Sequence, residues 1–225
     1  MDNILILLGW GLFTATHIGL AMVPVRAALI NRLGENRYRG LYSLIAILTF
    51  GFLIYSYVVA GSTEVVIYDG GTLNVVFSSI NQLLMILAFI LLFGSQTQKN
   101  PMGMVPTHPE PFGFTRITRH PQNMAFSIFG LAHLLTSKTI ADFIFFGGFL
   151  IFGIVVSLHQ DLKKTRLSET GFDSYIANTS TIPFIAILSG KQEFSKNEFR
   201  FGWIVISILV SVIARFLHPE ILSKF

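Results

Sequence analysis

Long runs of apolar residues dominate the chain and predict helices that cross a membrane. A helix needs about 20 mostly apolar residues to span the hydrocarbon core of a bilayer. The runs that approach this length are Ile4 to Val23, Leu41 to Ala60, Thr72 to Phe93, Arg119 to Ser137, Thr139 to Leu158, and Phe201 to Leu217. We therefore expect an all-α fold, a polytopic transmembrane helix bundle of about six spans.

The segments between these runs are polar loops, and no internal repeat or domain boundary interrupts them. The longest, Gly94 to Thr118, is rich in proline and has little helical periodicity. A further apolar run, Ile182 to Leu188, is too short to cross a bilayer and predicts a re-entrant or interfacial piece. The sequence thus predicts one domain over residues 1–225.

Basic residues in the short loops predict the orientation of the helices. The second connection carries Glu64 and Asp69 and no basic residue, whereas the first connection is strongly basic. The basic residues of the first connection are Arg26, Arg32, Arg37 and Arg39. Because cytoplasmic loops carry the excess of Lys and Arg, the first connection is expected in the cytoplasm. With an even number of spans, both termini then face the periplasm or exterior.

Composition supports a membrane protein and excludes several kinds of site. Hydrophobic residues make up 52% of the 225 positions and charged residues 12%, and the mean hydropathy is +0.64. The chain has no cysteine, which excludes disulfides, thiolate metal sites and a cysteine nucleophile. The formal charge of +4 comes without a basic tract, so we expect the lipid bilayer as partner and no nucleic acid.

Two histidines, His17 and His133, lie inside apolar runs and are the first candidates for a buried site. An imidazole at that depth needs a hydrogen-bond partner, a metal or a cofactor. His120 and His133 would lie about 20 Å apart along one helix, so they cannot share a metal ion. A haem held from both faces could use His17 and His133. Alternatively, each histidine only joins helices by hydrogen bonds, for example to Thr14 or Asn81.

A polar string leads into the fourth apolar run and places Arg119 and His120 at the cytoplasmic edge of the membrane. Pro121 follows them, at a position suited to the first turn of a helix. Arg119 and His120 are candidates for ordering one end of a site, or for anchoring the chain to anionic lipid. His108 and His218 are each followed by proline, and we expect no special role for them.

The motifs of the first 135 residues resemble those of the NnrU family, which is named for a membrane protein linked to bacterial nitrite and nitric oxide metabolism and has zeta-carotene isomerase among its plant relatives. The segments that carry the resemblance are Thr16 to Ala21, Gly34 to Ser43, Ile117 to Gln122, and Gly130 to Leu135. They occur in the family's order. The spacing of the last two segments makes the match more specific than a lone Arg-His-Pro string.

The resemblance implies a haem b between His17 and His133, and a redox-gated cis-trans isomerisation of a hydrophobic polyene or other lipophilic substrate. Bacterial members point instead to a factor in nitrogen-oxide respiration, or denitrification, in the inner membrane. The electron donor is unknown. Candidates for pairing with the haem propionates are Arg37, Arg39, Arg116 and Arg119, because a guanidinium group binds a carboxylate with two hydrogen bonds.

A second resemblance is to the isoprenylcysteine and phospholipid methyltransferases, which bind S-adenosylmethionine. It rests on Arg119-His120-Pro121, on Asp161 and on the stretch from Phe172 to Tyr175. Asn123 and Ala125 replace the tyrosine and glycine of that family's first string. This alternative places Arg119, His120 and Asp161 at the cofactor. A third alternative is a non-catalytic assembly or regulatory subunit of a membrane complex.

Overall fold

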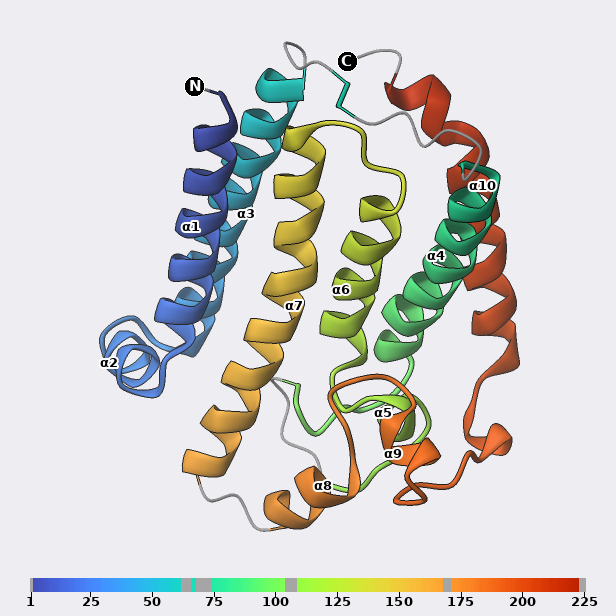
Figure 1. The fold of residues 1–225 in the computed structure, drawn as a ribbon. Helices are drawn as coiled ribbons and strands as arrows, with labels where there is room; N and C mark the ends of the chain where they lie inside the picture. The colour runs from blue at the N-terminus through green and yellow to red at the C-terminus, as the bar shows by residue number, and fades with distance from the viewer. Residues whose placement is uncertain (1, 62–65, 68–73, 104–108, 168–170, 223–225) are drawn as a thin grey trace. The chain divides into compact units, whose positions relative to one another are not determined.

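The computed structural model describes residues 2–61, 66–67, 74–103, 109–167 and 171–222, and the regular elements in these ranges are all helices (Figure 1). They are α1 (Asp2–Ala21), α2 (Val23–Leu33), α3 (Glu35–Gly61), α4 (Asn74–Gln96), α5 (Phe114–Ile117), α6 (Pro121–Leu134), α7 (Ile140–Arg166), α8 (Phe172–Asn178), α9 (Ile185–Leu188), the 3-10 helix η2 (Lys196–Glu198) and α10 (Phe201–Leu222). Within these described ranges, five helices, α1, α3, α4, α7 and α10, are long and apolar enough to cross a membrane. The predicted all-α membrane fold is confirmed.

The fourth predicted span differs from the structure. Its helix, α6, has 14 residues, a length of about 21 Å, which is shorter than the hydrocarbon core of a bilayer. Pro121 begins the helix at its first turn, as predicted. The helix ends at Leu134, before the polar Thr136 and Ser137. Six crossings and the orientation of the termini therefore stay predictions.

The described residues form two compact units, and the first contains α1 to α3 with residues 137–148 at the start of α7. Trp10 donates a hydrogen bond from Nε1 to the carbonyl oxygen of Phe145, at 3.2 Å. The ring of Phe145 stacks on Tyr57, with ring centroids 4.1 Å apart. Gly148 lies against the Trp10 ring, where a Cβ would overlap it. Close packing around Trp10 thus joins α1 and α3 to α7 within this unit.

The beginning of α7 is capped by side chains. Asp142 accepts hydrogen bonds from the backbone N–H groups of Lys138 and Thr139, each at 3.0 Å, and its own N–H donates to Thr139 Oγ1 at 3.1 Å. This reciprocal arrangement is a capping box, which satisfies backbone donors that have no partner within the helix. The Tyr57 hydroxyl also donates to Asp142, at 2.7 Å. The same carboxylate therefore caps α7 and attaches α3 to it.

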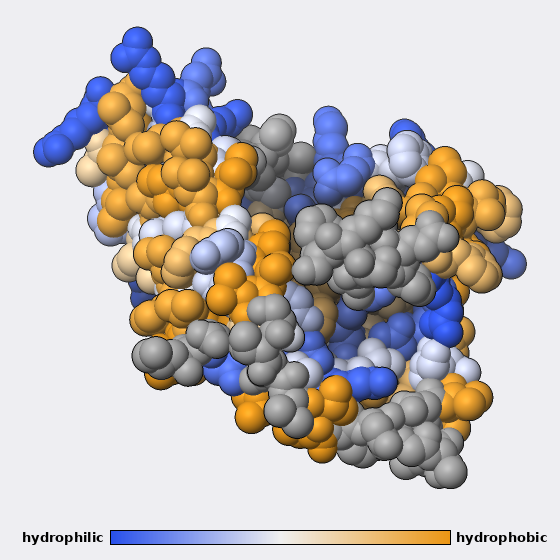
Figure 2. Space-filling model, turned by 90° about the horizontal axis from the view of Figure 1, so that it is seen from above, coloured by the Kyte–Doolittle hydropathy of each residue, from blue (hydrophilic) through white to orange (hydrophobic). Residues whose placement is uncertain are grey.

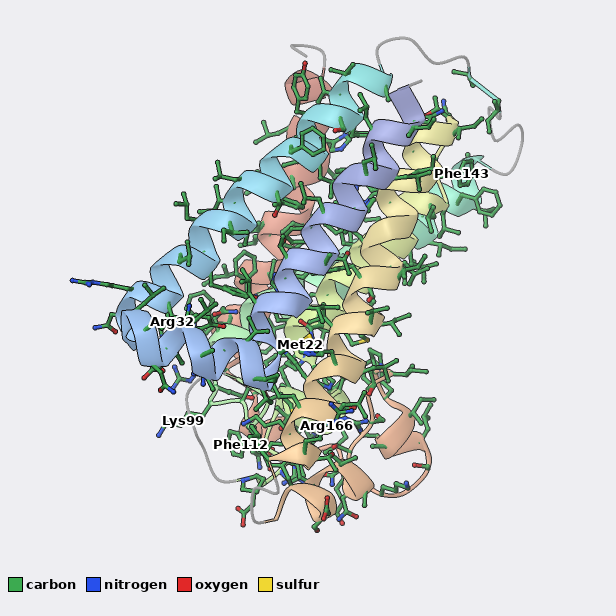
Figure 3. The ribbon with its side chains drawn as sticks, turned by 90° about the vertical axis from the view of Figure 1, so that its left-hand side faces the viewer. Met22, Arg32, Lys99, Phe112, Phe143 and Arg166 are labelled. Atoms are coloured by element: carbon green, nitrogen blue, oxygen red, sulfur yellow. The ribbon has the colours of Figure 1, made fainter. Side chains whose placement is uncertain are left out.

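The chain turns sharply at Met22, and the segment predicted as a loop after the first span forms α2. Pro24 lies in the first turn of α2, and a proline restricts the residue before it, which favours a helix boundary here. Figure 3 shows Met22 at this bend and Arg32 near the far end of α2. Arg37 and Arg39, also predicted in the connection, lie in the first turns of α3.

The second unit contains α4 to α6, the remainder of α7, and α8 to α10. Helix α4 packs against both α6 and α10 (Figure 1). The core includes Leu91 of α4, Phe114 and Ile117 of α5, and Met124 and Ile128 of α6. The predicted short run, Ile182 to Leu188, forms the four-residue helix α9, which packs against α5. It is too short to cross a membrane, as expected.

Large apolar side chains cover much of the surface, as expected for helices that face lipid. Ile47 and Leu48 of α3, Leu83 of α4 and Ile151 of α7 are each more than 60% exposed. Figure 2 shows hydrophobic residues spread over the face seen from above. In a soluble protein, apolar area on this scale would promote aggregation. Here it identifies a lipid environment and supports the predicted bilayer partner.

Candidate functional site

His17 lies on α1 of the first unit among aromatic side chains. Its ring centroid is 5.5 Å from that of Phe13, one turn earlier on the same helix, and 5.2 Å from that of Tyr42 on α3. The Tyr42 hydroxyl donates a hydrogen bond to the His17 carbonyl oxygen at 3.3 Å. The side chain is half-buried. The structure thus places His17 against α3 within an apolar, aromatic environment.

His133 lies near the end of α6 in the second unit, and its tautomer follows from one hydrogen bond. Nδ1 is 2.9 Å from the carbonyl oxygen of Phe129. Because a carbonyl oxygen only accepts, Nδ1 carries the proton, and in the neutral ring Nε2 then carries the lone pair. Histidines that bind metals use this same arrangement, in which a carbonyl group orients the ring.

His133 also lines a pocket of about 230 Å³ between α4, α6 and α10. Asn81 of α4, which the sequence suggested as an example of a hydrogen-bond partner for a histidine inside the membrane, donates to the carbonyl oxygen of Ala132, the residue before His133, at 2.7 Å. The ring of His218 on α10 lies 6.2 Å from the ring of His133. His218, for which no role was predicted, thus shares a pocket with a candidate site residue.

Arg119 and His120 hold a single carboxylate, that of Asp161 on α7. Arg119 binds it through Nε at 3.0 and 3.1 Å and through Nη2 at 2.8 Å. His120 binds it through Nε2 at 2.8 Å. The His120 side chain is fully buried, and the side chains of Arg119 and Asp161 are 11% and 14% exposed. We call these three residues the Asp161 cluster.

Neighbouring polar groups complete the hydrogen bonds of the Asp161 cluster. His120 Nδ1 lies 3.0 Å from Oε1 of Gln160, which also accepts from the Asn123 amide at 3.2 Å. Arg119 Nη1 donates to the Thr179 carbonyl oxygen at 2.9 Å. Both ring nitrogens of His120 thus face oxygen atoms. A buried network with this many satisfied groups orders the segments that carry it.

The backbone around Arg119 explains how this cluster forms. The Arg119 N–H donates to the Ser180 carbonyl oxygen at 2.9 Å, and the Phe184 N–H donates to that of Ile117 at 2.8 Å. These bonds hold the segment after α5 beside the segment after α8. Pro121 then starts α6 and sets the direction of the chain after His120. The result is that Arg119 and His120 both meet the last turns of α7.

Two of the remaining arginine candidates, Arg116 and Arg39, are also engaged with carboxylates. Arg116 binds Glu198 through Nε and Nη2, both at 2.8 Å, and reaches Gln192 through Nη1 at 2.8 Å. Arg39 pairs with Glu35 at 2.8 Å in an exposed (i, i+4) ion pair. Arg37 is exposed on the first turns of α3. Both Arg116 and Arg119 thus hold protein carboxylates, the groups that propionates would have to displace.

The ion pair between Arg116 and Glu198 makes the stability of the folded protein depend on pH. Hydrogen bonds from Arg116 hold the pKa of the Glu198 carboxyl below its ordinary value. When the pKa of a carboxyl group is lower in the folded protein than in the unfolded chain, ionisation of that group stabilises the fold. The stabilisation is complete at pH values above the pKa in the unfolded chain, and it is lost as the pH falls through the pKa in the folded protein. We expect thermal unfolding in detergent to show an acid-dependent loss of about 1 kcal/mol or less below about pH 4.3. Glu198→Gln should lack this component, and a parallel loss in both proteins would contradict the assignment.

Several residues of these networks were not apparent from the sequence. Glu198 and Gln192 lie far along the chain from Arg116, and no local pattern connects them. Arg215 and His218, three residues apart, occupy one face of α10, and this spacing was the available signal for the pocket they line. His108 lies outside the described residues.

The structure brings Arg119, His120 and Asp161 together, as the methyltransferase alternative requires. Their donors and acceptors, however, bind one another and neighbouring groups of the chain. This arrangement orders the protein around α6 and α7. His17 and His133 belong to different units, so their convergence on one site stays a prediction.

Comparison with known proteins places the chain in a family. It is 28% identical over 227 aligned positions to "15-cis-zeta-carotene isomerase, chloroplastic" of Zea mays, which covers 92% of this chain and 58% of that protein. The protein of the same description from Arabidopsis thaliana is 32% identical over 112 positions, covering 48% of this chain and 30% of that protein. No solved structure matches. The model of the family described as "NnrU protein" matches residues 5–224, and the chain belongs to this family.

Proposed function

We propose that this protein is a membrane isomerase that acts on a lipophilic polyene and carries haem b between His17 and His133. The observation that carries the proposal is the similarity to a 15-cis-zeta-carotene isomerase over 92% of this chain. The chain spans only 58% of that relative, so the activity is proposed from the shared part. Apolar surfaces on α3, α4 and α7 suit a substrate that arrives from the bilayer.

The two histidines fit the requirements of haem ligands. The hydrogen bond from His133 Nδ1 to Phe129 sets the tautomer whose Nε2 bears the lone pair, and it orients the ring. His17 lies beside the rings of Phe13 and Tyr42, which cover part of its side chain. An apolar, aromatic surrounding of this kind suits an apolar macrocycle. The ligand pair is thus supported by the local environment of each ring.

Bound haem would supply redox chemistry at its iron. The chain would hold this group through the two imidazoles and exclude water with the aromatic side chains beside them. Arg37 and Arg39, at the beginning of α3, are exposed guanidinium groups suited to carboxylate partners. The Asp161 cluster would fix the start of α6, the helix that carries His133.

An absorption spectrum of the detergent-purified protein tests the cofactor. We expect a Soret band that collapses in His17→Ala and His133→Ala, because each removes one of the two imidazoles that would hold the haem. His159→Ala on α7, a half-buried histidine outside the proposed site, is the control and should keep the band. A protein without a Soret band, or a band unchanged in both ligand variants, would reject the haem assignment.

A separate assay tests the isomerase activity. The haem-loaded protein is reduced and incubated with a cis-polyene in lipid vesicles, and the cis and trans forms are then separated by chromatography. We expect conversion that requires the reduced protein and falls by at least about tenfold in His133→Ala. If the haem-loaded protein leaves the isomer ratio unchanged, the isomerase assignment fails while the haem assignment stands.

A further inference from the structure

The pocket beside His133 has a chemistry that haem ligation does not explain. It lies within the second unit, between α4, α6 and α10, and has a volume of about 230 Å³. The polar side chains that matter here are Ser78, Gln82, His133, Ser211, Arg215 and His218. Among the ten lining residues that the structure describes, none is acidic. This described lining combines one permanent cation and two imidazoles with neutral hydrogen-bonding groups.

Arg215 is held across the pocket by α4. Its Nη2 donates to Ser78 Oγ at 2.8 Å, and its Nη1 lies 3.4 Å from Gln82 Oε1. A snorkelling arginine would extend along its own helix towards water, whereas this guanidinium crosses to the neighbouring helix. The hydrogen bonds that the structure describes for it go to neutral oxygens. A guanidinium group has five N–H donors, so these contacts orient Arg215 without neutralising its charge.

The position of Arg215 in an apolar helix indicates that its charge faces a binding partner or a polar cavity. It lies within the apolar stretch Phe201–His218 of α10, which is long enough to cross a membrane. A cation in such a segment is costly and usually faces a partner or a polar cavity. His218 lies one turn further along the same helix and lines the same pocket. Gln82 is held in place by its own hydrogen bond to Ser211, at 3.2 Å.

We infer that this pocket binds an anionic oxygen group, a carboxylate or a phosphate, through Arg215 and His218. The guanidinium group supplies paired donors, the imidazole supplies a further donor, and the Ser78 and Ser211 hydroxyls complete the surroundings. His133 forms part of the wall. The source of the anion is either a lipid headgroup or a small solute. This inference goes beyond the proposed isomerase and stands on Arg215 and His218, which that proposal does not use.

Binding experiments on the purified full-length chain test this inference. Inorganic phosphate is titrated by calorimetry into the protein in neutral detergent, and thermal stability is measured in micelles containing phosphatidylglycerol or phosphatidylcholine. We expect saturable phosphate binding, a higher melting temperature with phosphatidylglycerol, or both. A response to phosphate identifies a small anion as sufficient, and a response to phosphatidylglycerol alone identifies a lipid headgroup. No response to either probe would overturn the inference.

Two substitutions assign the response to the pocket. Arg215→Gln keeps hydrogen-bonding capacity but removes the charge, and it should weaken binding by about tenfold or more. Arg200→Gln, an exposed arginine just before α10, is the matched control and should bind like the parent protein. His218→Gln, at an exposed position, provides a second test if Arg215→Gln does not fold. Unchanged binding in both pocket variants would overturn the inference.

Discussion

Asp161→Ala is expected to destabilise the second unit by about 3–5 kcal/mol, the typical cost of removing one partner from a buried ion pair. The substitution leaves the Arg119 guanidinium group, 11% exposed, without its carboxylate. It also removes the hydrogen-bond partner of His120 Nε2, in a side chain with no exposure. For a chain of this size, the change corresponds to a melting temperature lower by about 6–20 °C.

Thermal unfolding in detergent, followed by circular dichroism, measures this loss. The control is Glu35→Gln, which removes an exposed ion pair with Arg39 and should cost about 1 kcal/mol or less. The double substitution Arg119→Leu with Asp161→Leu should cost less than the sum of the two single changes, because no unpaired charge remains. Equal melting temperatures for Asp161→Ala and Glu35→Gln would refute the structural importance of the cluster.

Gly153→Ala is expected to destabilise the protein by about 1–3 kcal/mol, the typical cost of overpacking. Gly153 lies where α7 passes close to α6. An added Cβ would overlap the backbone oxygen of Asn123 and the Ser127 hydroxyl. Because one of these atoms belongs to the backbone, a rotamer change cannot relieve the contact. The hydrogen bond from Ser127 Oγ to the Leu150 carbonyl oxygen, at 3.1 Å, would also be strained.

The matched control is Gly51→Ala in α3. Gly51 also lies in the middle of a long apolar helix, but a Cβ there meets nothing within 4 Å. Alanine has a higher helix propensity than glycine, so this variant should be neutral or slightly more stable. The difference between the two melting temperatures reports the contact between α6 and α7. If the two variants have the same melting temperature relative to the parent protein, α6 and α7 do not approach each other as closely as described.

The apolar pattern located most of the long helices because membrane insertion is largely a property of local sequence. Each apolar residue contributes to transfer into lipid nearly independently, and backbone hydrogen bonds within lipid require a helix. The predicted runs Leu41 to Ala60 and Phe201 to Leu217 accordingly lie within α3 and α10. The predicted helix ends were less accurate than the predicted helix positions. Helix α7 continues to Arg166, well past the predicted Leu158, through polar residues with high helix propensity.

The site residues also divide into those that a local sequence motif identified and those that only the folded structure brings together. Arg119, His120 and Pro121 form a local string that the sequence singled out, and Asp161 entered through a motif resemblance. The contact between them joins residues 42 positions apart. The ion pair of Arg116 with Glu198 joins residues 82 positions apart, and the bond of Arg215 with Ser78 joins residues 137 apart. No periodicity connects such positions.

By itself, the sequence determined that this protein is an all-α membrane protein of the NnrU family with candidate histidines inside apolar helices. These features follow from local hydrophobicity and short motifs. The tertiary structure decided which carboxylate each arginine binds, the tautomer of His133, and the pocket shared by α4, α6 and α10. Such contacts depend on how helices pack against one another, and packing depends on side chains that lie far apart in the chain.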